Sequence, residues 1–278
     1  MAPVTGWAGP LRARGLALVL LLALALGACG TTASAAPADP ASAGATATPS
    51  TEATDTLHVV GLGDSVMAGT NCDCDGIVKE YAAGLAASTQ RHVASTDLSA
   101  GGLVTDDVDE GLTDDAHQQQ ALRAADVVLV TIGANDLNPA LDKWRSATCD
   151  AACYGGLAER MGRTLSTVLD KIKALVPPSA QVLVTNYWNV FTDGAMTRRA
   201  VGQAQIDFSE DVTDAANRQI CAAAQAHSDT CVDLLVPFKG TTADPVDVTP
   251  LLAQDGDHPD AAGVRVIVKA LLTATHTP

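Results

Sequence analysis

Residues 126–132 of this chain are DVVLVTI, an apolar run in which β-branched side chains predominate. After Asp126 only Thr131 interrupts the apolar residues, so both faces of the segment avoid water. This pattern is typical of a central strand in a parallel sheet, which helices cover on both sides. We therefore expect residues 126–132 to form the middle of a buried parallel sheet.

Strand-like and helix-like segments alternate on either side of this run. Short apolar runs predict strands at 57–62, 92–98, 181–185 and 230–235, and helical spacing predicts helices at 77–87, 157–175, 209–227 and 259–274. This order predicts an α/β fold, a three-layer α/β/α sandwich with a parallel, flavodoxin-like five-stranded sheet.

The first 56 residues have a different character. Arg12 and Arg14 precede an apolar run that ends at Leu26-Gly27-Ala28-Cys29, an arrangement typical of an export signal. The four-residue ending resembles the lipobox of bacterial lipoproteins, which implies cleavage before Cys29 and lipid attachment to its sulfur. An ordinary cleaved signal with an incidental cysteine is the alternative. We expect a signal peptide at 1–28, a lipidated cysteine and an Ala/Thr/Ser/Pro-rich tether at 29–56, and one globular domain at 57–278.

Charge limits the classes of partner. The chain has 17 Lys and Arg against 32 Asp and Glu, a formal net charge of −15. Nucleic acids and anionic lipid surfaces are bound by excess positive charge, so we expect neither as a partner. We expect a monomer that meets the membrane only through its lipid anchor, at the outer face of the cytoplasmic membrane or in the cell envelope.

Export places the remaining cysteines in an oxidising compartment, where an even number favours disulfides. Cys221 and Cys231 form the pair we favour, because it would join a helix to the following strand. The other four are Cys72, Cys74, Cys149 and Cys153. A bond between the first two would close a very small ring, so bonds to the second two are at least as plausible. The spacing fits common zinc sites poorly.

Polar residues follow three of the predicted strands. Gly63-Asp64-Ser65-Val66 comes after the first strand, Gly133-Ala134-Asn135-Asp136 after the central one, and Asp255-Gly256-Asp257-His258-Pro259 before the last helix. Ligands of open parallel sheets bind at the carboxyl ends of the strands, so we expect these segments to meet at one edge. Together they contain a nucleophile, a base, a base-orienting carboxylate and an oxyanion donor, the parts required for acyl transfer.

These segments resemble the sequence blocks of SGNH/GDSL serine hydrolases, in the order of that family and over about residues 57–274. The resemblance implies Ser65 as nucleophile, His258 as base and Asp255 as its orienting carboxylate. It implies an oxyanion hole formed by the backbone N–H groups of Ser65 and Gly102 and the side chain of Asn135. Adjacent Gly101 leaves the register of the Gly102 block slightly open.

Three further features have open interpretations. Asp257 could compete with Asp255 for the imidazole or face water, and we favour water. Asn71, Asp73 and Asp75 copy the opening of a calcium loop, but the twelfth position lacks the required Glu, so we expect a polar loop and no metal. The aromatic cluster Tyr187, Trp188 and Phe191 could line a substrate pocket or pack in the core.

We therefore expect a serine esterase that cleaves carboxylic esters through an acyl-enzyme, with no metal or organic cofactor. Its substrate would be a small-molecule, lipid or glycan ester. An O-acyltransferase or a carbohydrate acetylesterase on the same fold is the nearest alternative. A non-catalytic surface-binding module is an alternative from another class, and binding alone has no need of this residue set.

Overall fold

Five parallel strands form the central sheet of this computed structural model, which describes residues 56–146, 148–191 and 193–276. The strand order is β2-β1-β3-β4-β5. The strands are β1 (Thr56–Gly63), β2 (His92–Asp97), β3 (Val127–Thr131), β4 (Gln181–Thr185) and β5 (Thr230–Val232). The predicted parallel, flavodoxin-like sheet is confirmed. The expected signal peptide, Cys29 and nearly all of the expected tether lie outside the described residues.

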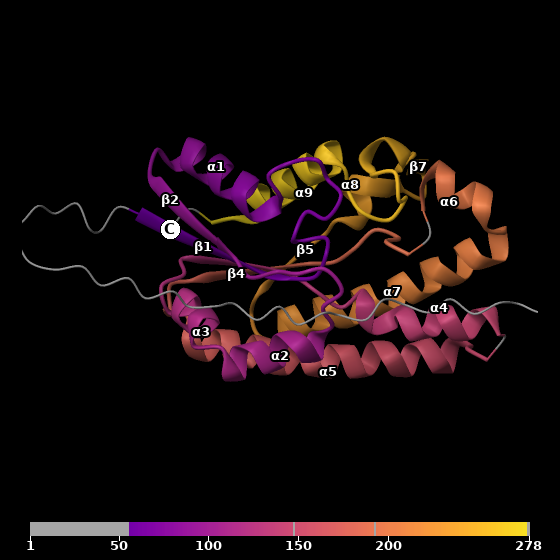
Figure 1. The fold of residues 1–278 in the computed structure, drawn as a ribbon, viewed down its shortest axis with the longest axis horizontal. Helices are drawn as coiled ribbons and strands as arrows, with labels where there is room; N and C mark the ends of the chain where they lie inside the picture. Colours follow the sequence, from indigo (N-terminus) through magenta and orange to yellow (C-terminus); the bar gives the residue numbers. More distant parts are fainter. Residues whose placement is uncertain (1–55, 147, 192, 277–278) are drawn as a thin grey trace, which may run out of the picture. The chain divides into compact units, whose positions relative to one another are not determined.

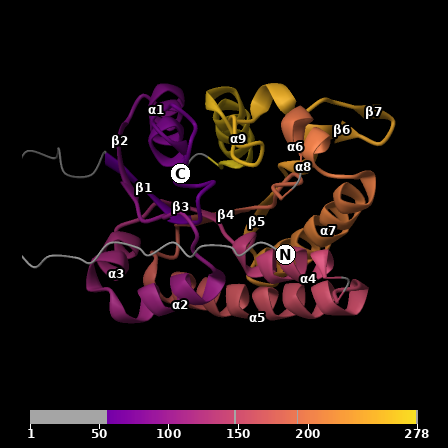
Figure 2. The same ribbon diagram turned by 45° about the vertical axis from the view of Figure 1, so that its right-hand side comes forward.

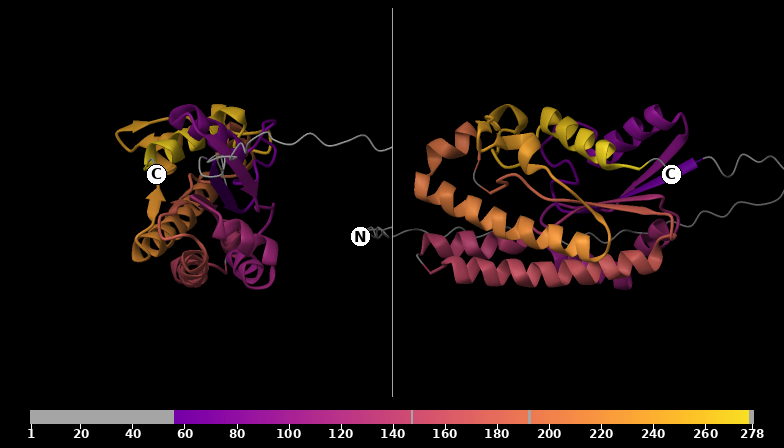
Figure 3. Two further views of the ribbon diagram at one scale, coloured as in Figure 1. Left: turned by 90° about the vertical axis from the view of Figure 1, so that its left-hand side faces the viewer. Right: turned by 180° about the vertical axis from the view of Figure 1, so that it is seen from behind.

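Helices cover both faces of the sheet in three layers (Figures 1 and 2). One layer contains α1 (Ile77–Thr89), α8 (Leu235–Lys239) and α9 (Ala261–Ala274). The other contains α2 (Thr105–Asp114), α3 (Ala116–Arg123), α4 (Asn138–Arg145), α5 (Ala151–Leu175) and α7 (Gln203–Ala226). The long helices α5 and α7 lie side by side, as the reverse view also shows (Figure 3).

The shorter elements gather near the carboxyl ends of the strands. They are η2 (Asn135–Leu137), α6 (Gly194–Ala200), β6 (Gly240–Thr241), β7 (Asp244–Pro245) and η3 (Thr249–Leu251). In the part of the chain that the structure describes, no helix has both the length and the apolar character needed to cross a bilayer.

Strand β3 is the core of the sheet, as its composition predicts. All five of its residues are buried, and it pairs with β1 on one side and β4 on the other. At the end of β1 the backbone of Gly63 approaches that of β3 so closely that a Cβ would lie 2.0 Å from the Thr131 carbonyl oxygen. A glycine is therefore required immediately before Asp64, and it fixes where the next residues emerge.

The described residues contain three disulfides. They join Cys72 to Cys74, Cys149 to Cys153 and Cys221 to Cys231. The favoured bond between α7 and β5 is found. The other four cysteines pair locally and not across the molecule, and both local pairs have Cα separations, 5.2 and 5.1 Å, that are ordinary for disulfides.

Candidate active site

The candidate site lies at the point where the strand order reverses, between the carboxyl ends of β1 and β3. Ser65 follows β1 and Asn135 follows β3, while the loop between η3 and α9 carries His258. Such a reversal leaves a crevice between the loops of neighbouring strands, which is where ligands bind in open α/β sheets. The predicted strand-end residues therefore meet from segments that are far apart in the sequence.

A continuous chain of contacts joins the serine to a carboxylate. His258 Nε2 lies 2.8 Å from Ser65 Oγ, and His258 Nδ1 lies 2.9 Å from Asp255 Oδ2. Asp255 Oδ1 accepts hydrogen bonds from the backbone N–H groups of Asp257 and His258, which fix the turn that carries both side chains. This geometry allows the imidazole to take a proton from Ser65 while the carboxylate holds its opposite nitrogen.

Asn71, which the sequence placed in a calcium-like loop, contacts the active site. Its Nδ2 donates a 2.5 Å hydrogen bond to Asp255 Oδ2, the same oxygen that contacts the imidazole. Partial burial by itself raises the pKa of Asp255. The hydrogen bonds to this carboxylate, of which that from Asn71 has the largest effect, nevertheless hold its pKa well below the usual value. The loop of Asn71 is closed by the Cys72–Cys74 disulfide, and Asp75 pairs with Lys79. Two of the three calcium-like side chains thus have other partners.

Asp257 corrects an expectation. Its Oδ1 lies 3.0 Å from His258 Nδ1, so it contacts the imidazole and does not simply face water. The tight turn at Gly256, which has φ +82°, brings the two carboxylates to the same nitrogen. Asp257 together with Asp255 raises the pKa of His258 to about 9, against the lowering effect of partial burial. Asp255, Asp257 and His258 are close enough to hold an ion, but their contacts with one another already account for this closeness.

The oxyanion donors expected from the sequence also meet here. Asn135 Nδ2 donates one hydrogen bond, 2.9 Å long, to the Leu103 carbonyl, and its Oδ1 accepts a 3.2 Å bond from Asn138. These two bonds fix the orientation of the amide and leave its second N–H hydrogen to face a ligand. The turn of Gly101 and Gly102 lies beside Ser65, since a Cβ on Gly101 would be 3.9 Å from that of Ser65.

Buried polar contacts hold the surrounding loops. Asp64 Oδ1 accepts from the Val66 N–H at 2.9 Å, and Asp64 Oδ2 accepts from the Tyr187 hydroxyl at 2.5 Å. Asp136 accepts from the backbone N–H and the hydroxyl of Thr105, at the start of α2. These carboxylates fix the strand-end loops in place.

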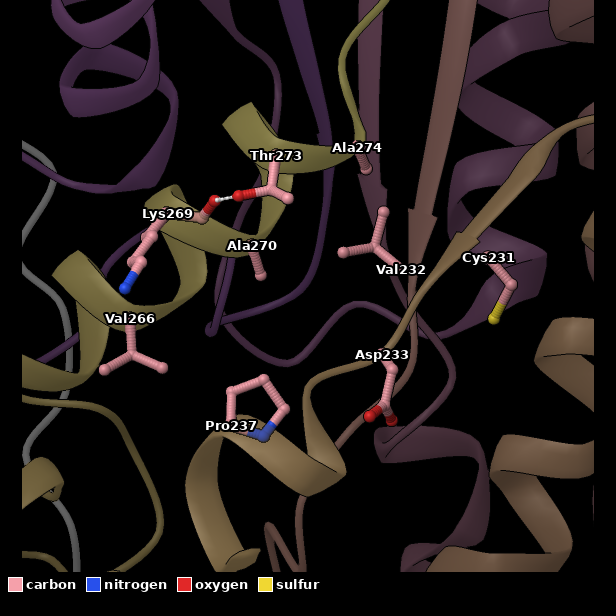
Figure 4. A pocket seen from close by; sticks show the side chains of 9 residues that line it. All are labelled: Cys231, Val232, Asp233, Pro237, Val266, Lys269, Ala270, Thr273 and Ala274. Atoms are coloured by element: carbon pink, nitrogen blue, oxygen red, sulfur yellow. Dashed lines mark hydrogen bonds between the residues drawn. The ribbon is translucent and has the colours of Figure 1, made fainter.

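A cleft of 420 Å³ opens beside Ser65 and His258. Leu141, Val190 and Phe191 line one part of it, and Asn138 and Asp142 line another. Of the three clustered aromatics only Phe191 faces this cleft, because Tyr187 and Trp188 are buried in the core. A groove of 570 Å³ lies elsewhere, between β5, α8 and α9 (Figure 4), and none of its lining residues belongs to the site.

Residues 62–266 match the GDSL-like lipase/acylhydrolase family. The chain belongs to that family. The matched range contains every strand-end segment described above, and family membership makes the protein a carboxylic ester hydrolase. No curated protein sequence matches the chain.

Solved structures resemble this GDSL-like hydrolase in fold. A lipase from a goat rumen metagenome has a TM-score of 0.65 at 20% identity, with 78% of this chain and 97% of that chain covered. An extracellular lipase from Streptomyces rimosus has a TM-score of 0.58 at 22% identity, with 79% and 100% covered. A variant of an acetyl xylan esterase from Geobacillus stearothermophilus has a TM-score of 0.55 at 17% identity, with 78% and 93% covered.

Proposed function

We propose that the protein is a serine esterase that forms its acyl-enzyme on Ser65. The observation that carries this proposal is the contact chain from Ser65 Oγ through His258 to Asp255, with separations of 2.8 and 2.9 Å. His258 Nε2 accepts the Ser65 proton as Oγ bonds to the ester carbonyl carbon, and it then gives that proton to the leaving alkoxide. Water, deprotonated by the same nitrogen, releases the acid and restores Ser65.

The carbonyl oxygen becomes an oxyanion in both steps and requires donors. We assign this role to the backbone N–H groups of Ser65 and Gly102 and to the free N–H of the Asn135 amide. Removal of one such donor typically costs about 2.7–4 kcal/mol of transition-state stabilisation. The hydrogen bonds that fix Asn135 on Leu103 and Asn138 support this assignment, because a donor that is already oriented needs no reorganisation during the reaction.

The cleft favours short, uncharged carboxylic esters. Its apolar part, formed by Leu141, Val190 and Phe191, suits a small acyl group. Its polar part, which includes Asn138 and Asp142, suits an alcohol with further hydroxyl groups. A carbohydrate acetylesterase is therefore the second candidate, and an acyltransferase to a sugar hydroxyl would use the same cleft. A purely binding module has no use for an imidazole held between a serine and a carboxylate.

The test is a panel of p-nitrophenyl esters of increasing acyl length, run on residues 57–278 and on Ser65→Ala. We expect turnover to be greatest for acetyl and butyryl esters and to be lost in Ser65→Ala. Ser88→Ala, which removes a helix-surface hydroxyl of α1, is the matched control and should leave turnover unchanged. Absence of turnover by the wild type, together with no labelling by a serine-directed phosphonate, would refute the proposal. Acetylated oligosaccharides and an alcohol acceptor then separate the esterase, acetylesterase and transferase activities.

We propose in addition that the mature protein is lipid-anchored at Cys29 on the outer face of the cytoplasmic membrane or in the envelope. The apolar run that ends Leu26-Gly27-Ala28-Cys29 supports this. Radiolabelled palmitate fed to expressing bacteria should label the wild type and not Cys29→Ser, and the variant should partition into the detergent-poor phase. Equal labelling of both would reject the anchor.

A further inference from the structure

His258 has two carboxylates at one ring nitrogen. Asp255 Oδ2 lies 2.9 Å from Nδ1 in hydrogen-bond geometry, and Asp257 Oδ1 lies 3.0 Å from the same atom as an ion-pair contact. Asp257 Oδ1 also accepts the backbone N–H of His258 at 3.0 Å, so its position is fixed and does not depend on a flexible surface rotamer. Neither carboxylate is deeply buried, because 28% of the Asp255 side chain and 44% of the Asp257 side chain are exposed.

The first carboxylate is not fully available to the imidazole. Asp255 Oδ2 shares its lone pairs between His258 and the amide of Asn71, whose hydrogen bond is the shorter of the two. A hydrogen bond from Asn71 to that oxygen draws negative charge away from the imidazole. In the described part of the chain, Asp255 and Asp257 on its own loop and Asp64 beyond β1 act on the charge of the ring. Asp142 of α4 lines the same cleft, and the lining includes no Lys or Arg.

We propose that Asp257 is a second positioning residue for the catalytic histidine, which strengthens it as a base and supports it when Asp255 is lost. This inference rests on the proposed function, since it assigns His258 as the base. An imidazole with a single carboxylate partner would have no acceptor at Nδ1 once that carboxylate was removed. In this chain the backbone N–H of His258 keeps Asp257 beside Nδ1, so a second acceptor remains.

The consequence for proton transfer has a definite sign. Two negative charges favour the imidazolium, and Asp257 is the largest cause that raises the pKa of His258, to about 9. The free enzyme must lose that proton before His258 can act as a base. We therefore expect kcat/KM to rise with pH up to about 9 and then to level off.

The experiment measures pH profiles of kcat/KM for wild type, Asp257→Asn, Asp257→Glu, Asp255→Asn and the Asp255→Asn/Asp257→Asn double variant. Asn at 257 can still accept the backbone hydrogen bond but carries no charge. The midpoint in Asp257→Asn should move to lower pH by about 1–2 units, and Asp257→Glu should restore most of that difference. The double variant should lose about tenfold or more relative to Asp255→Asn alone. Asp114→Asn, an exposed acid at the end of α2, is the matched control for one lost charge and should keep the wild-type midpoint.

An unchanged midpoint in Asp257→Asn, together with equal activities of Asp255→Asn and the double variant, would overturn the inference. A second measurement does not depend on turnover. The ring protons of His258, assigned by their loss in His258→Ala, are titrated by NMR in wild type and Asp257→Asn. A shift to lower pH in the variant supports the role of Asp257 even if no ester is hydrolysed, whereas identical titrations reject it. Failure of the ester panel alone would reject only the proposed function.

Discussion

Asp64 is the residue whose environment is least expected next to a nucleophile. It is a fully buried carboxyl, 1% exposed, held by the Tyr187 hydroxyl and the Val66 N–H. Burial raises the pKa of Asp64 from 3.8 to about 6, although both hydrogen bonds act in the opposite direction. The folded protein therefore binds this proton more tightly than the unfolded chain does. The stability contributed by the protonated form is complete below about pH 4 and is lost as pH rises through 6.

The prediction at this residue concerns stability against pH. A shift of this size corresponds to about 3 kcal/mol of stability. The wild type should lose this stability between pH 4 and 7 as the buried carboxyl ionises, and Asp64→Asn, which has no ionisable group there, should not. Across this range the melting temperature should vary less with pH for Asp64→Asn than for wild type. The melting temperature of the variant should exceed that of the wild type most at pH 7 and above. Asp114→Asn is the control and should follow the wild type. Parallel curves for wild type and Asp64→Asn would contradict the assigned pKa.

Sequence reasoning succeeded for residues whose position follows from a strand end. It predicted that Ser65, Asn135 and His258 lie together, because the carboxyl ends of parallel strands meet at the same edge of the sheet. It was wrong for Asp257 and did not find Asn71. Their contacts depend on the turn at Gly256 and on the loop of the Cys72–Cys74 disulfide, and no periodic pattern determines the direction of a side chain in such turns.

At the scale of elements, the loop before α9 is held by its contact with α6. A Cβ on Gly256 would lie 2.4 Å from Thr197 Oγ1, and the φ of +82° is strained for any other residue. The backbone N–H of Ala195 in α6 also donates to Thr249 Oγ1 in η3. Helix α6 thus acts as a support for the segment that carries Asp255 and His258.

Gly256→Ala should therefore lower both kcat and the melting temperature, because the loop must move away from α6. Removing the opposing hydroxyl in Gly256→Ala/Thr197→Ala should recover part of the loss, although not the part due to backbone strain. The matched control is Gly155→Ala in α5, where a Cβ meets nothing within 4 Å and the change should be neutral or stabilising by up to about 1 kcal/mol. If Gly256→Ala and Gly155→Ala had equal kcat values and equal melting temperatures, α6 would not support the loop as assigned.

The strands were predictable and several helices were not. Buried apolar runs define β3 and β4 closely, since few other structures bury both faces of four or five successive residues. Helix α2 was missed because its sequence, TDDVDEGLTD, is mostly polar and buries only a narrow stripe. Strand β5 is shorter than expected because Leu235 begins α8, and a short apolar run fits either element.

For the molecule as a whole, the net charge of −15 becomes relevant at the cleft. Asp142 and Asp257 line it, and no Lys or Arg among the described residues does so. We expect kcat/KM for a succinate half-ester to be about tenfold or more below that for a neutral ester of equal acyl length. Added NaCl should raise the rate of the anionic substrate and leave the neutral one unchanged. If the ratio of the two kcat/KM values did not change with salt, the negative charge of the cleft would play no part in this selectivity.

The direction of β1 also separates the first described residue of the chain from the nucleophile. Strand β1 begins at Thr56, and its eight residues end at Gly63, close to Ser65. Thr56 and the nucleophile therefore lie at opposite ends of the strand, about 25 Å apart. A tag or a solid support attached directly before Thr56 would therefore join the domain at the end of β1 that is remote from the cleft, and we expect it to leave access to Ser65 open.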